Sequence, residues 1–465
     1  MFRAVQLGRV IVLVVILMVM PPFVATSAQT PTEATRLVFE IADKVRFYQI
    51  DSAGIRTPIY ELSADFAVLS HGKAEWIIPI PESIVVSPQA DKIAFVAIQN
   101  YTDSALFWFD VHDPVLRQTP LPGLGGLQWS PDGRMILLFP DGVEISIPVY
   151  VKDAYVYSFE AGTLNPLVNP VNKPFGNFHW FDSHRILYRA QSEDCAAPCI
   201  DAGNLFLFEL DTQTTTRLTD IGHQLPADAP NDKIQFYADC RADIVRWSSA
   251  NNRLYYSVNC VDTADQVHSY LYSSDLSGGN QLEADLLTLQ PENFYAVIQS
   301  IHVIDDTVYF TIESEIRPKG EGAAAIYAGW RIYALSNNGV RSIWEARFNE
   351  AGAAWLSAVE VSPDNRKLMV GGLDYTSDEE GYFAVVDLES GQIILQGHVP
   401  TNICEIEWLE ATRVIYQQFS GICGSSFIAP TSFTVLNLAT GEWEELISDF
   451  AGPVWMLTAE NIFAP

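Results

Sequence analysis

A short motif that recurs along the chain limits the possible folds more than any other feature. Its clearest copy, GLQWSPDGRMILLF at residues 126–139, has two apolar runs around a Ser-Pro-Asp-Gly turn. Short β-rich runs that flank such turn residues indicate a β-hairpin. Seven further segments keep the same apolar frame, and they begin at Ser83, Asn177, Ile244, Ser300, Ala358, Glu405 and Gly452. The hairpin is therefore the unit from which the chain is built, which predicts an all-β repeat protein.

The frame of the hairpin has two fixed apolar positions. The first is Trp129 in the clearest copy, and the second, Ile136, follows seven residues later. All eight copies keep apolar residues at both positions. The tryptophans of this repeat are expected to pack between neighbouring units.

A second pattern follows the hairpins and predicts a third strand. It is an apolar, aromatic-rich run that ends in Asp, Glu or Asn, as in ALFWFDVHD from Ala105. The eighth copy, VRFYQIDSAG from Val45, lies at the opposite end of the chain from the last hairpin, 453–464, which lacks a third strand. We therefore expect one sheet to combine that hairpin with third and fourth strands from the N-terminus. Such closure would remove exposed sheet edges.

The turn residues carry a resemblance to a known family. Ser-Pro-Asp-Gly-Arg at 130–134 and Ser-Pro-Asp-Asn-Arg at 362–366 resemble the WD40-like (PD40) repeats of TolB-like β-propellers. The resemblance implies a single β-propeller domain at 29–465, and the eight repeat units of the chain predict about eight four-stranded blades, closed by N- and C-terminal strands. Seven blades are the alternative if the N-terminal strands do not close the ring.

Turn chemistry and irregular spacing give further expectations. Asp132, Gly133 and Asp364 are expected to shape their own turns, because Asp and Ser side chains hydrogen-bond to nearby backbone N–H groups. The units are unevenly spaced, so insertions must lie in loops. The largest are expected around 191–203, 219–243 and 312–329.

Six cysteines in a chain with an export signal favour disulfides over a metal site. Cys240 and Cys260 lie at equal distances from the centre of one hairpin, near Ala250, and form the first expected pair. Six cysteines allow fifteen connectivities, so the other pairs remain open. The expected pairs are Cys240–Cys260, Cys404–Cys423 and Cys195–Cys199.

Strand alternation points to one candidate functional set. The residue just before the repeat tryptophan position is polar or ionisable in six of the eight hairpins, whereas the residue two before it is always apolar. Successive side chains of a strand point to opposite faces, so the polar residues lie on one face of each strand and their apolar neighbours on the other. The TolB-like resemblance implies that this strand is innermost and that these side chains face a central channel. The candidate ligand-binding ring is Gln128, His179, Arg246, His302, Glu360 and Glu407.

This ring allows two interpretations. A polar lining that satisfies its own hydrogen bonds is the simpler one. As a ligand site, Arg246 would pair with a carboxylate or phosphate, whereas His179, His302, Glu360 and Glu407 suit a divalent metal or acid–base chemistry. We expect no cofactor, with a divalent metal as the alternative, and no residue is assigned a catalytic role.

The N-terminus predicts export. The cationic MFRAVQLGR, the apolar IVLVVILMVM and small residues up to Ala28 are arranged as in a secretory signal peptide at 1–28, with an uncleaved anchor as the alternative. No later segment approaches a membrane span. A formal net charge of −30 disfavours nucleic acid and favours cations, basic partners or simple solubility. We expect a periplasmic, cell-surface or secreted protein.

The motifs favour binding over catalysis. The nucleophile elbow, the H-E-x-x-H metal motif, the P-loop and the dinucleotide fingerprint are absent. We expect an exported, non-catalytic binding or scaffold module for an extracytoplasmic protein, peptide or glycan, with contacts on loops such as 191–203 or 312–329. The alternative is a metal-assisted, lyase-like enzyme that acts on an extracellular polysaccharide in the axial channel. That enzyme would need His179, His302 and the two glutamates of the ring to converge on one pocket.

Overall fold

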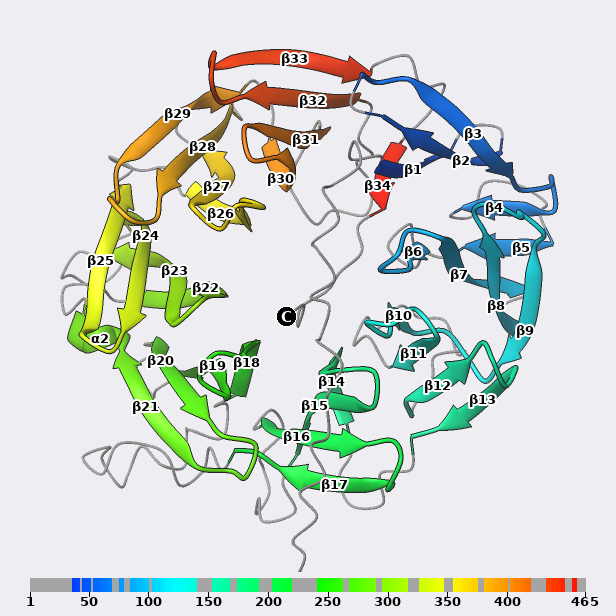
Figure 1. The fold of residues 1–465 in the computed structure, drawn as a ribbon, viewed down its shortest axis with the longest axis horizontal. Helices are drawn as coiled ribbons and strands as arrows, with labels where there is room; N and C mark the ends of the chain where they lie inside the picture. The colour runs from blue at the N-terminus through cyan, green and yellow to red at the C-terminus, as the bar shows by residue number, and fades with distance from the viewer. Residues whose placement is uncertain are drawn as a thin grey trace, which may run out of the picture.

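The chain folds into a closed ring of eight blades, a β-propeller, as Figure 1 shows. Pairing of Gly203 with Arg241 joins blades 4 and 5 into one continuous sheet. In each blade the first strand faces the centre of the ring and the fourth lies at the rim. The computed structural model describes residues 36–41, 44–51, 53–68, 75–78, 84–99, 103–139, 153–167, 174–191, 203–219, 241–261, 267–289, 295–316, 326–346, 354–374, 380–399, 402–419, 432–447 and 454–457. The expected eight-bladed, all-β fold is confirmed.

Seven blades use four strands that follow one another in the chain. The first three of these are blade 2, with β6 (Ile84–Val86), β7 (Lys92–Gln99), β8 (Asp103–Asp110) and β9 (Arg117–Leu121); blade 3, with β10 (Gly126–Trp129), β11 (Met135–Phe139), β12 (Tyr155–Ser158) and β13 (Thr163–Pro166); and blade 4, with β14 (Pro174–Trp180), β15 (Arg185–Gln191), β16 (Gly203–Glu209) and β17 (Thr214–Arg217).

The other four continue around the ring in the same way. They are blade 5, with β18 (Arg241–Ser248), β19 (Arg253–Val261), β20 (Val267–Ser274) and β21 (Asn280–Asp285); blade 6, with β22 (Tyr295–Ile304), β23 (Thr307–Ile316), β24 (Ile326–Ser336) and β25 (Gly339–Ala346); blade 7, with β26 (Ala354–Val361), β27 (Lys367–Asp374), β28 (Glu380–Asp387) and β29 (Ile393–Val399); and blade 8, with β30 (Asn402–Glu410), β31 (Arg413–Phe419), β32 (Ser432–Asn437) and β33 (Glu442–Ile447). A one-turn helix, α2 (Leu286–Leu289), follows β21.

The two inner strands of these blades are the predicted hairpins. Trp129 of β10 lies opposite Ile136 of β11, and the same spacing of seven residues pairs the two apolar positions in blades 2, 5 and 7. In blade 4 the turn is one residue shorter, so Trp180 pairs with Ile186. Every predicted aromatic-rich run forms the third strand of its blade, including β2 (Val45–Ile50) in blade 1.

Blade 1 is assembled from both termini, but not in the expected proportion. Its strand order from the centre is β34 (Val454–Leu457), β1 (Arg36–Ile41), β2 and β3 (Arg56–Glu61). The expectation of two C-terminal strands is wrong, because β1 forms an antiparallel hairpin with β2 and occupies the second position, with Phe39 opposite Trp455. The C-terminus therefore contributes one described strand and the N-terminus three.

Blade 2 carries two additional short strands that the repeat did not predict. β5 (Trp76–Ile78) pairs with the far end of β7, while β6 pairs with its near half. β4 (Phe66–Val68) then pairs in parallel with β5. The innermost position of this blade is therefore divided between two segments.

The core consists of apolar layers between neighbouring blades. Phe47 of blade 1 and Phe109 of blade 2 are fully buried and meet edge to face at 5.2 Å. Phe181 of blade 4 meets Trp247 of blade 5 in the same way at 5.0 Å. The second contact confirms that the repeat tryptophan Trp247 packs between blades.

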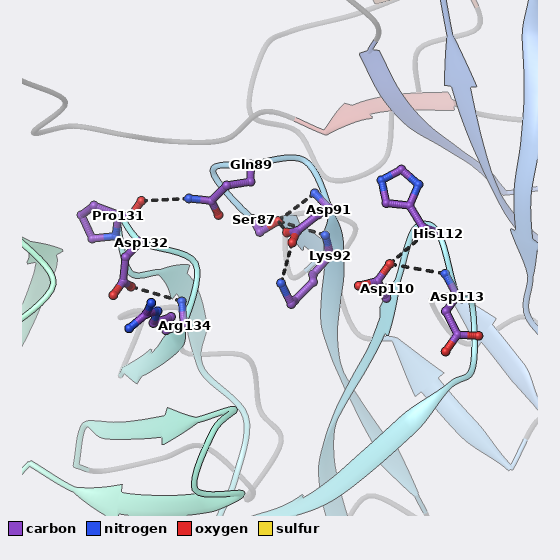
Figure 2. A network of polar contacts seen from close by, with 10 residues as sticks. All are labelled: Ser87, Gln89, Asp91, Lys92, Asp110, His112, Asp113, Pro131, Asp132 and Arg134. Carbon is purple, nitrogen blue, oxygen red and sulfur yellow. Dashed lines mark hydrogen bonds and ion pairs between the residues drawn. The ribbon is translucent and has the colours of Figure 1, made fainter. Parts of the chain in front are cut away.

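The Ser-Pro turns are held by their own side chains. Ser130 Oγ donates to Asp132 Oδ1 at 2.7 Å and accepts a hydrogen bond from the Met135 N–H at 2.9 Å. Ser362 bonds to Asp364 and to the Lys367 N–H in the same way. Figure 2 shows the corresponding turns of blades 2 and 3 side by side, joined where Gln89 Nε2 donates to the Pro131 carbonyl at 3.4 Å. The structural role expected for these aspartates is confirmed.

Gly133 has a backbone conformation that favours glycine. Its φ of +66° lies in the left-handed region, and a Cβ there would lie 2.1 Å from Gln89 Oε1, the end of a flexible side chain. A larger residue at this position would therefore strain the turn and require the Gln89 side chain to shift.

Several expectations concern residues whose structure is not described. The signal peptide at 1–28, Cys240, Cys195, Cys199, Cys423 and most of the loops 191–203 and 219–243 lie outside the described residues. The third predicted loop is wrong in extent, because β23 continues to Ile316 and β24 begins at Ile326. Within the described ranges, no helix has the length and apolar character needed to cross a membrane.

Cys260 on β19 is fully buried and disulfide-bonded. Its partner is not among the described side chains, so the pair Cys240–Cys260 stays a prediction. The strand register supports it, since Arg241 of β18 lies opposite Asn259, which precedes Cys260.

Candidate functional site at the propeller axis

The six residues of the candidate ring all lie on innermost strands. These strands surround the centre of the propeller in Figure 1. The residues and strands are Gln128 on β10, His179 on β14, Arg246 on β18, His302 on β22, Glu360 on β26 and Glu407 on β30. The fold therefore places these six residues on the innermost strands, as the TolB-like resemblance implied.

Burial along these strands alternates as expected. On β30, Ile406 and Trp408 are buried, while Glu407 between them is half-buried. On β22, Ile301 is buried and His302 is half-buried, and Glu360 on β26 is exposed. The polar positions therefore have more access to solvent than the apolar positions that pack between blades.

Gln128 differs from the other ring residues, because its polar groups bind the next blade. Its side-chain Oε1 accepts a hydrogen bond from the Trp180 backbone N–H at 3.0 Å, and its carbonyl accepts one from the Trp180 indole at 3.0 Å. Only 8% of Gln128 is exposed. These contacts give Gln128 a structural role between β10 and β14.

His179 is separated from the other ionisable residues that were expected to share a pocket with it. It lies on blade 4, four blades from Glu407 on blade 8, which is the opposite side of an eight-bladed ring. His302, Glu360 and Glu407 instead lie on three successive blades.

Electrostatic coupling joins four ring residues into one group. His302 is half-buried by accessible area, yet its Nε2 lies inside the protein, and loss of hydration, followed by the positive charge of Arg246, lowers the pKa of the imidazole to about 3. Glu360 is exposed by accessible area, yet loss of hydration raises the pKa of its carboxyl to about 7, with repulsion from Glu407 adding to the shift and Arg246 opposing it. Arg246 lies on blade 5 and Glu360 on blade 7, so this charge interaction joins two blades that are not neighbours in the ring. We call Arg246, His302, Glu360 and Glu407 the axial cluster.

His302 contributes an unsatisfied polar atom to this cluster. Its Nε2 is buried and has no hydrogen-bond partner. Because the imidazole is neutral at pH 7, one of its two nitrogens is a hydrogen-bond acceptor. Buried polar atoms are almost always paired, so such an atom marks a place for a polar ligand atom or water.

The axial cluster combines several chemical capacities in one place. Arg246 supplies a permanent cation and several donors, and Glu407 and Glu360 supply carboxyl groups. A carboxyl group with a pKa near 7 can both donate and accept a proton at neutral pH. In the described part of the chain, no three His, Cys, Asp or Glu side chains are grouped so that they could hold a metal ion. A divalent metal at the ring stays a prediction.

One buried carboxylate near the ring was missed from the sequence. Glu40 on β1 lies opposite Val454, the ring position of blade 1, and only 2% of it is exposed. Tyr48 Oη donates to its carboxylate at 3.0 Å, and Arg46 lies 3.8 Å from it. Segment 36–41 was not recognised as a strand of the repeat, so no signal pointed to Glu40.

Comparison with known proteins identifies the fold and not the family. No protein-family model matches the chain, and no curated protein matches it. A structure described as the eukaryotic initiation factor is 11% identical, with a TM-score of 0.51 over 91% of this chain and 98% of the other. At such low identity the similarity shows a shared fold alone.

Two further solved structures belong to proteins with different activities. A prolyl endopeptidase is 12% identical with a TM-score of 0.46, over 82% of this chain and 51% of that enzyme, so the chain spans about half of its length. The periplasmic gluconolactonase PpgL of Pseudomonas aeruginosa is 14% identical with a TM-score of 0.40, over 77% of this chain and 95% of the other.

Proposed function

We propose that this protein is an exported, non-catalytic β-propeller of the TolB-like type that binds an extracytoplasmic protein, peptide or glycan at the axial cluster. The observation that carries the proposal is the coupling of Arg246, His302, Glu360 and Glu407 on four successive blades. Binding sites commonly place a few polar groups so that they converge on one ligand. The TolB-like assignment is supported by the Ser-Pro turns, whose side-chain hydrogen bonds recur in blades 2, 3 and 7.

The composition of the cluster favours binding over the metal-assisted, lyase-like alternative. A divalent cation at the ring would be repelled by Arg246, which already acts on both His302 and Glu360. A polar organic ligand meets no such conflict, because the cluster offers donors and acceptors together. We therefore place binding before catalysis.

Export is supported by two features of the chain. The first is the signal-peptide pattern at 1–28. The second is the disulfide of Cys260, a bond that persists in oxidising compartments such as the periplasm or the extracellular space.

The test is a binding screen with two matched variants. Glycan and peptide arrays would be probed with the wild type, with Glu407→Gln and with Glu410→Gln. Glu410 is an exposed residue at the end of the same strand, so it controls for loss of one negative charge.

We expect a ligand that binds the wild type and Glu410→Gln but binds Glu407→Gln at least tenfold more weakly, with unchanged melting temperatures. If every ligand binds all three proteins equally, the binding site does not include Glu407 and lies away from the axis. Conversion of a bound ligand to product would overturn the non-catalytic part of the proposal.

A further inference from the structure

We propose that this protein forms a dimer through β29, the outermost strand of blade 7, which pairs antiparallel with β29 of a second copy about a two-fold axis. A strand at the edge of a sheet has unpaired N–H and C=O groups along one side and can add a strand from another chain. The dimer would join the two copies of blade 7 into one continuous sheet. β29 lies at the rim of the ring and away from the axial cluster, as Figure 1 shows, so this interface is separate from the proposed binding site.

The outermost strands of the blades differ in how they are protected against such pairing. Natural proteins place proline or charged side chains on edge strands for this purpose. Seven of the eight outermost strands that the structure describes carry one or both: β3 and β9 contain proline and arginine, β13 ends in Pro166, β17 ends in Arg217, and β21, β25 and β33 contain glutamate. β29, with the sequence IILQGHV, has no proline, aspartate, glutamate, lysine or arginine.

The edge of β29 is regular enough to receive another strand. The residues from Leu395 to Val399 pair one to one with β28, which gives this stretch the spacing of an ordinary strand. Its other side has no partner among the described strands. A bulge at Ile394 precedes the stretch, but β21, β25 and β33 contain bulges as well, so the bulge does not set β29 apart.

β29 also exposes adjacent apolar side chains. Ile393 and Ile394 are 44% and 41% exposed. Among the described outermost strands, the only other large apolar side chain with this much exposure is Leu282 on β21, at 45%. Because β21 also contains Glu283 and Asp285, β29 is the one described edge that combines exposed apolar residues with the absence of charge.

Symmetry favours a second copy of the chain as the partner. In an antiparallel pair about a two-fold axis the same strand supplies both sides, so each charged residue would approach like charges of the other copy. Like charges on opposing strands are destabilising, and β33 with its three glutamates would therefore repel itself. A partner of another sequence could match charge with opposite charge. Self-pairing instead needs a neutral strand, which is what β29 provides.

The rest of the surface opposes the dimer, which gives the interface a characteristic salt dependence. Each copy has a formal net charge of −30, so two copies repel one another over long range at low ionic strength. Salt screens this repulsion and leaves the contacts of a neutral strand unaffected. We expect the dimer to tighten several-fold between about 20 mM and about 500 mM salt, whereas a complex held by opposite charges would weaken.

The test is sedimentation velocity of the purified protein over a concentration series, with two matched pairs of variants. Gln396→Lys adds a charge to the regular part of β29, and Gln281→Lys adds the same charge to an exposed glutamine of β21. Ile394→Lys and Leu282→Lys form the second pair, with similar exposure of the residues replaced. We expect the dissociation constant of the dimer to rise at least about tenfold in the two β29 variants and to stay within about twofold in the two β21 variants.

Hydrogen exchange of the backbone amides locates the interface. Peptides that cover 393–399 should exchange more slowly in concentrated than in dilute protein, because pairing protects the outward amides of β29. Peptides that cover β25 should exchange alike at both concentrations. Thermal melts confirm that each variant is folded.

Four results would overturn the inference. They are a monomer at every concentration up to millimolar in high salt, a Gln396→Lys dimer as tight as that of the wild type, equal weakening by Gln396→Lys and Gln281→Lys, and concentration-dependent protection of another segment without protection of β29. None of them bears on ligand binding at the axis, which is tested with Glu407→Gln, so the two proposals fail independently.

Discussion

Trp180 makes two hydrogen bonds to Gln128 of the preceding blade. Its backbone N–H donates to the Gln128 side-chain Oε1, and its indole Nε1 donates to the Gln128 carbonyl, each at 3.0 Å. The indole of Trp408 bonds to the carbonyl of Glu360 in the same relation, at 3.2 Å. In these blades the repeat tryptophan therefore links adjacent inner strands at the ring position.

Replacement of Gln128 by leucine should destabilise the propeller. The variant keeps the side-chain volume but leaves the buried Trp180 N–H without an acceptor, which costs about 1–3 kcal/mol of unfolding free energy. Chemical denaturation measures the change. The control is Gln89→Ala, which removes an exposed link of 3.4 Å between blades 2 and 3 and should cost under about 0.5 kcal/mol. Equal losses in the two variants would contradict a special role for the buried link.

Replacement of Ala90 by glycine should stabilise blade 2. Ala90 has a φ of 54° and occupies the turn position that is Gly133 in blade 3 and Asn365 in blade 7. A left-handed conformation costs a residue with a Cβ roughly 1–2 kcal/mol, and the greater freedom of glycine in the unfolded chain offsets part of this gain. We expect up to about 1 kcal/mol of added stability. Gly133→Ala should have the opposite effect, and a destabilised Ala90→Gly variant would show that the turn is not strained.

The repeated parts of the fold were predicted correctly because the residues that specify each turn and its two strands lie close together in the sequence. The Ser-Pro-Asp-Gly turn at 130–133 and its apolar flanks specify a hairpin from neighbouring residues alone. The aromatic third strands were visible for the same reason. Blade 1 was harder, since the second position of that blade is decided by competition between β1 and the C-terminal segment, which are distant in sequence.

The axial site could be predicted only in part. Period-two alternation placed Arg246, His302, Glu360 and Glu407 on one face of the inner strands, and the fold brings those strands together. Alternation could not reveal that Gln128 bonds to Trp180, because that contact depends on how two blades pack. It also could not separate His179 from the other residues, which depends on the number of blades between them.

His302 should make the protein sensitive to acid. Its pKa is about 3 in the folded state, below the ordinary histidine value of about 6.5, so the unfolded chain takes up a proton first as the pH falls. The stability that the neutral imidazole contributes is present above about pH 6.5 and is lost progressively towards pH 3. The free energy of unfolding of His302→Gln should fall less steeply over this range than that of the wild type. Parallel curves would show that His302 titrates alike in both states.

Glu360 should give the opposite pH dependence. Its pKa is raised to about 7 from the ordinary glutamate value of 4.5, so the folded protein holds this proton more tightly than the unfolded chain does. The associated stability is complete below pH 4.5 and is lost as the pH rises through about 7. Glu360→Gln should remove that decline, so its stability relative to the wild type should increase between those pH values. An unchanged difference across this range would mean that Glu407 and burial do not act on Glu360 as inferred.

The disulfide of Cys260 should connect the beginning of β18 to the end of β19. The register pairs Arg241 with Asn259, and its continuation by one residue would place Cys240 opposite Cys260. Peptide mapping without reduction should therefore recover Cys240 linked to Cys260. A disulfide that closes a loop of this length contributes about 3 kcal/mol. Cys240→Ser and Cys260→Ser should each lose about this amount, and the double variant should lose no more than either single one, because all three remove the same bond. A link from Cys260 to any other cysteine, or additive losses, would contradict the pairing.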